Sequence, residues 1–203
     1  MIVDAFQVLI SPRRYMAKLG AHEVTHRGSW AFIYIALWTI LPAAAFYYGT
    51  VHNGWTIGDR VIAINQTTGI ALAVCFYLVL NIVTIWAGYL LSWMSGTYHA
   101  RFEVMEGIET AGLAATPIYI AGIAAVYPIF WLDLLIAVVA VTISARILPI
   151  AIKERLKLPS DLVFLYSLSM FAALLVIACS ILGASTFAWS YLVTPVFVEL
   201  TPF

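Results

Sequence analysis

The stretch GIETAGLAATPIYIAGIAAVYP, residues 107–128, is apolar over the length that a helix needs to cross a lipid bilayer. A hydrocarbon core about 30 Å thick is spanned by about 20 residues of α-helix. Within the stretch, Ala111, Ala115, Gly122 and Ala125 follow one another at intervals of four, seven and three residues, which places them along one helix face. Because helices pack closely in lipid through small residues, we expect this segment to be the central helix of a membrane bundle.

Thr116 and Pro117 interrupt the middle of this helix. Proline removes one backbone hydrogen bond and clashes with the preceding turn, so the pair predicts a kink. The carbonyl group that the kink releases can be satisfied by the Thr116 side chain or by a neighbouring helix.

Four more apolar segments lie at about residues 29–50, 66–94, 131–151 and 162–193. The chain is 64% hydrophobic and 10% charged, with a mean hydropathy of +0.99, whereas a soluble domain is about half apolar and a quarter charged. We therefore predict an all-α integral membrane bundle of five transmembrane helices over residues 29–203, preceded by an amphipathic juxtamembrane segment at residues 1–28. The net charge of zero argues against nucleic acid as a partner.

The basic residues predict the orientation of these spans, because lysine and arginine are retained on the cytoplasmic side. They lie before the first span, between the second and third, and between the fourth and fifth: Arg13, Arg14, Lys18, Arg27, Arg101, Lys153, Arg155 and Lys157. The opposite side carries only Arg60. We expect a cytoplasmic N-terminus and a C-terminus outside the cytoplasm.

Several polar residues fall at or inside the predicted spans. Glu103 and Glu106 begin the third span, where the helix dipole favours a carboxylate. Glu109 and Arg146 lie deeper, in the third and fourth spans, and either would be costly facing lipid. The two could pair as a structural or a functional ion pair, or Arg146 could extend to the inner surface. Asn81, in the second span, is expected to make an interhelical hydrogen bond.

The segment His22-Glu23-Val24-Thr25-His26 has the spacing with which a helix presents two zinc ligands and a catalytic carboxylate. A third ligand would be required, and His99, Glu103 or Glu106 is predicted to lie on the same side of the membrane. The sequence predicts no soluble domain that could enclose such a site. We favour a solvated polar collar, and keep a structural or regulatory zinc site and a zinc peptidase with Glu23 as its base as alternatives.

The pattern GLAATPIYIAGIAAVYPIFWL at residues 112–132, with an N-terminal F-x-x-x-x-S-P segment and five spans, resembles the Ypt-interacting protein (Yip) domain family, and specifically its small bacterial inner-membrane members. The resemblance implies a five-helix fold with a cytoplasmic N-terminus. Eukaryotic members are implicated in trafficking through Rab/Ypt GTPases and in mutual association. This chain lacks their long soluble N-terminal region and the Tyr-Gly-Pro motif of their second span.

These observations predict a non-catalytic inner-membrane protein that organises the membrane or binds a partner, either a second copy of itself or another membrane protein, with no resident cofactor. One alternative is a transporter or channel for a small solute, ion or lipid, whose path would be lined by Glu109, Arg146, Asn81 and Thr116. The other alternative is a zinc-dependent membrane protein or peptidase that uses the segment from His22 to His26.

Overall fold

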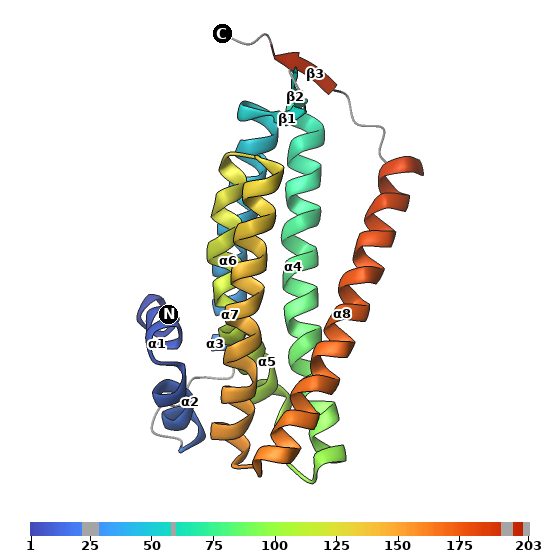
Figure 1. The fold of residues 1–203 in the computed structure, drawn as a ribbon. Coiled ribbons are helices and arrows are strands. Elements are labelled where there is room, and N and C mark those ends of the chain that lie inside the picture. Colours follow the sequence, from blue (N-terminus) through green and yellow to red (C-terminus); the bar gives the residue numbers. More distant parts are fainter. Residues whose placement is uncertain (22–28, 58–59, 192–196, 201–203) are drawn as a thin grey trace.

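The computed structural model describes residues 1–21, 29–57, 60–191 and 197–200, and long helices dominate it (Figure 1). Five helical segments are long and apolar enough to cross a membrane: Trp30–Asn53, Gln66–Tyr98, Val104–Val126, Phe130–Leu156 and Ser160–Phe187. The five predicted spans are therefore confirmed as helices of sufficient length. The fourth continues to Leu156, beyond the predicted end near residue 151. The orientation across the membrane stays a prediction.

The elements follow the chain in a simple up-and-down order. The helices are α1 (Ile2–Ile10), α2 (Pro12–Gly20), α3 (Trp30–Tyr48), η1 (Gly49–Asn53), α4 (Gln66–Ser95), η2 (Gly96–Tyr98), α5 (Val104–Ala114), α6 (Thr116–Ala121), η3 (Gly122–Val126), α7 (Phe130–Leu156) and α8 (Ser160–Tyr191), and the strands are β1 (Trp55–Ile57), β2 (Arg60–Ile64) and β3 (Phe197–Leu200).

A small antiparallel sheet with the strand order β1-β2-β3 lies at one end of the bundle (Figure 1). Val61 of β2 pairs with Leu200 of β3, so the tail of the chain returns to the loop that follows the first span. The expectation of an all-α chain missed this sheet, because its strands are three to five residues long and β3 is far from β1 and β2 in sequence, so they give little periodic signal. We call this end of the molecule the sheet end, and the opposite end the α2 end.

The third span is the most enclosed of the five. Its apolar window is 56% buried, the largest share among the spans, as expected for a central helix. The helix breaks at Ala115: α5 ends at Ala114, and α6 begins at Thr116 with Pro117 in its first turn. The predicted kink is therefore present. The Thr116 hydroxyl group donates to the carbonyl oxygen of Gly112 at 3.4 Å, one turn back.

Glycines allow the third span to approach its neighbours closely. A Cβ atom added at Gly88 of α4 would overlap the backbone of Ile108 in α5, and one added at Gly107 would overlap the carbonyl group of Gly88. A Cβ atom at Gly122 would overlap the side chain of Pro42 in α3. Close approach at these points lets helices pack in lipid without a hydrophobic driving force.

The other small residues of the predicted packing face have varied surroundings. Ala111 is buried in the core, and the carbonyl group of Ala125 lies against Gly49 at the end of the first span. Ala115 is half-buried at the helix break. Ala111, Gly122 and Ala125 thus serve contacts within the chain.

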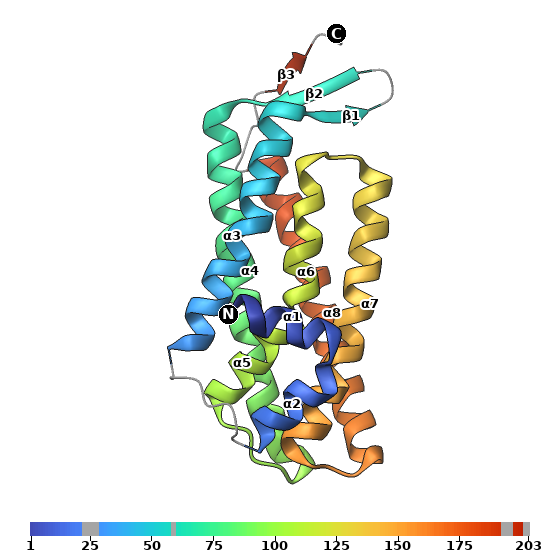
Figure 2. The ribbon, with the colours of Figure 1, turned by 90° about the vertical axis from the view of Figure 1, so that its left-hand side faces the viewer.

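The N-terminal helices α1 and α2 pack on the side of the bundle, across α5, α6 and α7 (Figure 2). Val8, Met16 and Leu19 are almost fully buried and belong to the same apolar cluster as Leu91 and Ile152 of the spans. Residues 1–20 are therefore part of the packed structure.

The close approach of α4 and α5 leads to a stability prediction. Replacing Gly88 with alanine should lower the free energy of unfolding by about 1 to 3 kcal/mol, the usual cost of overpacking, because the new methyl group meets rigid backbone. Thermal unfolding of the purified protein in detergent measures the effect. Gly183→Ala is the matched control, since nothing lies within 4 Å of a Cβ atom there. Equal losses in the two variants would contradict the proposed backbone contact.

Candidate functional site

An ion pair joins the third and fourth spans near the α2 end. The Nη2 atom of Arg155 in α7 donates to Oε2 of Glu109 in α5 at 2.8 Å, and the two side chains are only 5% and 10% exposed. Arg155 also donates through Nη1 to the hydroxyl group of Thr110 at 2.9 Å. Its guanidinium group lies 5.5 Å from the ring centroid of Phe102. The buried charge of Glu109 is thus compensated within the chain.

The suggested pairing of Glu109 with Arg146 is wrong, because Arg155 occupies that place. Arg146 lies nine positions earlier in α7 and is exposed. The fourth span predicted from the sequence ended near residue 151, which left Arg155 outside it. Because α7 continues to Leu156, Arg155 comes level with Glu109 and Arg146 lies closer to the middle of the span.

Contacts with the first span show at which level of the bundle the ion pair lies. The hydroxyl groups of Tyr34 and Thr116 are 2.7 Å apart, so these two residues lie at one level. Trp30, the first residue of α3, is four residues from Tyr34, or about 6 Å at 1.5 Å per residue. Glu109 is seven residues from Thr116 in the same direction, or about 10 Å. The ion pair therefore lies just beyond the level at which the first span begins.

Hydrogen bonds between side chains link the interior of the spans. In three interhelical pairs the donor and acceptor atoms are 2.7 to 2.8 Å apart: Asn81 with Thr39, Thr84 with Tyr119, and Tyr34 with Thr116. The expected interhelical hydrogen bond of Asn81 is present, donated to the Thr39 hydroxyl group. In each of these three pairs a polar group of one helix is satisfied by a neighbouring helix.

The four residues named for a transport path do not come together. Glu109 contacts Arg155, Asn81 contacts Thr39 and Thr116 contacts Tyr34, while Arg146 is exposed. Two grooves formed by described residues, one between α1 and α2 and one between α3 and α4, contain none of the four. This arrangement gives no support to a path lined by these residues.

The proposed metal ligands fall partly outside the described structure. His22, Glu23 and His26 lie outside the described residues. His99 is exposed with a positive φ of 55°, and the backbone N–H of Glu103 donates to Oε2 of Glu106 at 3.1 Å, part of a capping box that begins α5. Among the residues that the structure does describe, no three His, Cys, Asp or Glu side chains form a group that could hold a metal ion.

Two polar contacts that the sequence analysis missed fix α2 in place. The Tyr15 hydroxyl group donates to Oδ1 of Asp4 at 2.9 Å, and burial, together with this acidic partner, raises the pKa of Tyr15. Tyr15 therefore stays a neutral donor at physiological pH. Arg13 donates to Oε1 of Glu154 in α7 at 2.8 Å. No periodic pattern in the sequence signals either contact.

The ion pair generates a second prediction. Arg155→Gln should lower the free energy of unfolding by about 3 to 5 kcal/mol, because it removes the guanidinium group that pairs with the buried carboxylate of Glu109. The double variant Glu109→Gln, Arg155→Gln should lose less than the sum of the single variants. Denaturant unfolding in detergent measures both. Arg146→Gln is the charge-matched control and should change stability by at most about 0.5 kcal/mol; an equal loss there would restore Arg146 as the partner.

The third prediction concerns the segment from His22 to His26. As a solvated polar collar, it should leave the purified full-length protein without stoichiometric zinc in elemental analysis. The variants His22→Ala and His26→Ala should match the parent. One metal ion per chain in the parent, lost in both variants, would instead establish a metal site.

Comparison with known proteins bears directly on the family. The chain is 28% identical over 172 residues to Inner membrane protein YohC of Escherichia coli strain K12, an alignment that covers 84% of this chain and 85% of that protein. It has the same identity and coverage with Inner membrane protein YohC of Escherichia coli O6:H1. No solved structure matches the chain.

These relatives confirm the expected inner-membrane location at the level of homology, together with the five candidate spans. The model of the Yip1 domain matches residues 6–198, which includes most of α1 and all five spans. The resemblance seen in residues 112–132 is thus extended to nearly the whole chain, and the chain belongs to the Yip1 domain family.

Proposed function

We propose that this protein is a non-catalytic organiser of the inner membrane that binds a transmembrane helix of another protein, or of a second copy of itself, along the outer half of α8. The proposal includes a cytoplasmic α2 end, in agreement with the distribution of lysine and arginine in the sequence. It rests on one observation: the second half of α8 leaves the bundle.

The two halves of α8 differ in their packing. Near its start, Val163, Tyr166 and Met170 are 6%, 0% and 1% exposed, and they belong to the common core. From residue 171 to residue 187 no side chain is buried. Figure 1 shows this part of the helix diverging from α4 and α7 toward the sheet end. One long apolar helix is thus anchored in the core at one end, and none of its side chains from residue 171 to residue 187 is buried.

The outer half of α8 carries several small residues, none of which is buried. They are Ala172, Ala173, Ala178, Ser180, Gly183, Ala184 and Ser185. Glycines of the inner spans, such as Gly88 and Gly122, lie against the backbone or proline of another helix, whereas nothing lies within 4 Å of a Cβ atom at Gly183. Small residues that permit close approach are the usual contact of associating membrane helices. Their exposure supports α8 as the binding surface.

Several features support a binding protein over an enzyme. Asn81, Thr84 and Glu109 are each engaged in a contact between helices of the same chain. An organiser needs a rigid core and an open helix face, and this fold offers both.

The fourth prediction tests this surface. A photoreactive amino acid at Val176, which is 65% exposed on α8, should form a discrete protein adduct on illumination in native membranes. The same group at Val141, which is 55% exposed on α7, should label lipid only. Gel electrophoresis with antibody detection separates these results.

Two differently tagged copies of the purified protein in one nanodisc identify the partner. An adduct between the two tags means that α8 binds a second copy, and an adduct seen only in native membranes means that it binds another protein. If Val176 behaves like Val141 in both settings, the proposed binding surface is wrong.

A further inference from the structure

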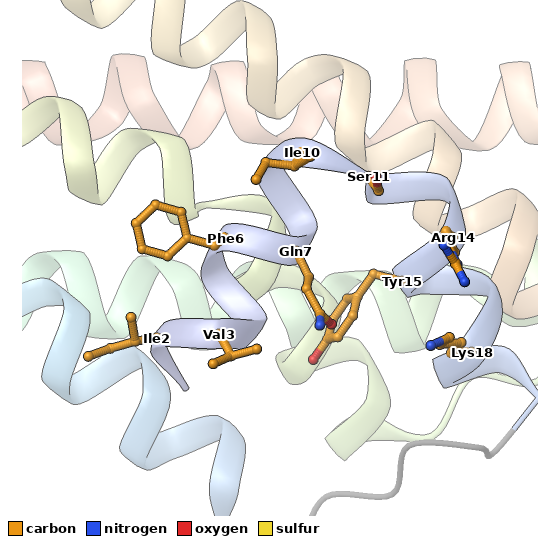
Figure 3. Close-up of a pocket in the computed structure, with 9 residues that line it drawn as sticks. All are labelled: Ile2, Val3, Phe6, Gln7, Ile10, Ser11, Arg14, Tyr15 and Lys18. Atoms are coloured by element: carbon orange, nitrogen blue, oxygen red, sulfur yellow. The ribbon is translucent and has the colours of Figure 1, made fainter.

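A groove with a volume of about 510 Å³ lies along the two N-terminal helices. Its lining residues come only from α1 and α2: Ile2, Val3, Phe6, Gln7, Ile10, Ser11, Arg14, Tyr15 and Lys18. In Figure 3, apolar side chains line the α1 part, Arg14 and Lys18 line the α2 part, and Gln7 and Tyr15 lie between them. The groove is thus apolar on one side and cationic on the other.

The apolar part of the groove is unusually open. Ile2, Val3, Phe6 and Ile10 are 67%, 65%, 57% and 78% exposed, while Ala5 and Val8 on the other face of α1 are almost fully buried against the bundle. A short helix that is apolar on both its packed and its free faces requires an apolar environment on the free side.

The position of α1 in the fold supplies that environment. α1 contacts both α5 and α6, so it lies beside the helix break at Ala115 (Figure 2). Thr116, next to the break, is level with Tyr34, one turn or about 6 Å inside the first residue of α3. Amphipathic helices lie about 5 to 10 Å deep, at the boundary between headgroups and acyl chains. α1 is therefore at the depth of an interfacial helix.

The cations of α2 are divided between two roles. Arg13 is paired with Glu154 of α7. Arg14 and Lys18, four residues apart and therefore on one face of α2, have no ion-pair partner within the described part of the chain. No acidic residue among the described ones lines the groove. Two uncompensated positive charges thus border an apolar surface at the membrane boundary.

We propose that this groove binds an anionic phospholipid, with its phosphate between Arg14 and Lys18 and its acyl chains on Ile2, Val3, Phe6 and Ile10. The charges match a phosphodiester, and the apolar side chains match the chains below it. A free phosphate ion would leave the apolar part uncovered. The inference is independent of α8 and of its partner.

Native mass spectrometry of the full-length protein in detergent tests the site, with phosphatidylglycerol and phosphatidylcholine as probes. The parent should bind phosphatidylglycerol more tightly than phosphatidylcholine. Arg14→Gln and Lys18→Gln should each weaken phosphatidylglycerol binding about five-fold, as expected for one basic residue at an anionic surface. Arg14→Lys, which keeps the charge, should bind like the parent.

Arg13→Gln is the matched control, since it removes the same charge from the adjacent position but outside the groove. It should leave the preference for phosphatidylglycerol within about two-fold of the parent. Phe6→Ala should weaken both lipids equally, because it removes apolar contact only. Circular dichroism and thermal unfolding verify that each variant is folded.

Three results would overturn the proposal. The parent could bind both lipids equally, Arg13→Gln could lose as much as Arg14→Gln, or inorganic phosphate could displace phosphatidylglycerol at concentrations that leave bulk screening unchanged. Equal binding of both lipids would mean that the groove does not recognise the headgroup. An equal loss in Arg13→Gln would mean that binding depends on the overall charge of α2. Displacement by inorganic phosphate would mean that the groove is a site for free anions.

Discussion

The backbone contact between α4 and α5 at Gly88 and Gly107 is the constraint on which the rest of the bundle depends. Apolar side chains gain little free energy by moving from lipid into a contact between helices. Membrane helices therefore stay together through close packing and polar contacts. Two glycines facing each other bring the third span against the second along its first turns. That placement in turn carries Glu109 into the interior and sets which residues of α7 and α3 can reach it.

Polar groups inside this bundle follow from the same environment. A hydroxyl or amide group surrounded by hydrocarbon has no water to bind, and a buried carboxylate needs a compensating charge, so both are stabilised by a partner on a neighbouring helix. Glu109 finds Arg155, Asn81 finds Thr39, and Tyr34 finds Thr116. Glu109, Asn81 and Thr116, three of the four residues named for a transport path, are therefore engaged in contacts between helices. Together with the hydrogen bond between Thr84 and Tyr119, they tie the third span to three neighbours. The enclosed part of the molecule thus forms a unit from which less enclosed parts project.

Two parts of the chain remain open to their surroundings, and each has its own physical character. The outer half of α8 is apolar and carries exposed small residues, a surface that suits the packing of another helix within the bilayer. The free face of α1, next to Arg14 and Lys18, is apolar beside positive charge, which suits the boundary where lipid headgroups lie. A protein that holds a lipid at one edge and a helix at another is well suited to organising its membrane.

Much of this protein follows from its sequence alone. Long apolar segments specify five membrane helices because only a helix satisfies its own backbone over such a length, Pro117 breaks the third span because it lacks an N–H, and the pattern of residues 112–132 indicates the family. Other features arose only in three dimensions. Arg155 rather than Arg146 meets Glu109 because the end of α7 could not be read from hydropathy, where a charged turn still continues the helix. The sheet, the divergence of α8 and the anchoring of α2 through Tyr15 and Arg13 depend on contacts between distant residues, and periodicity within one segment carries no information about them.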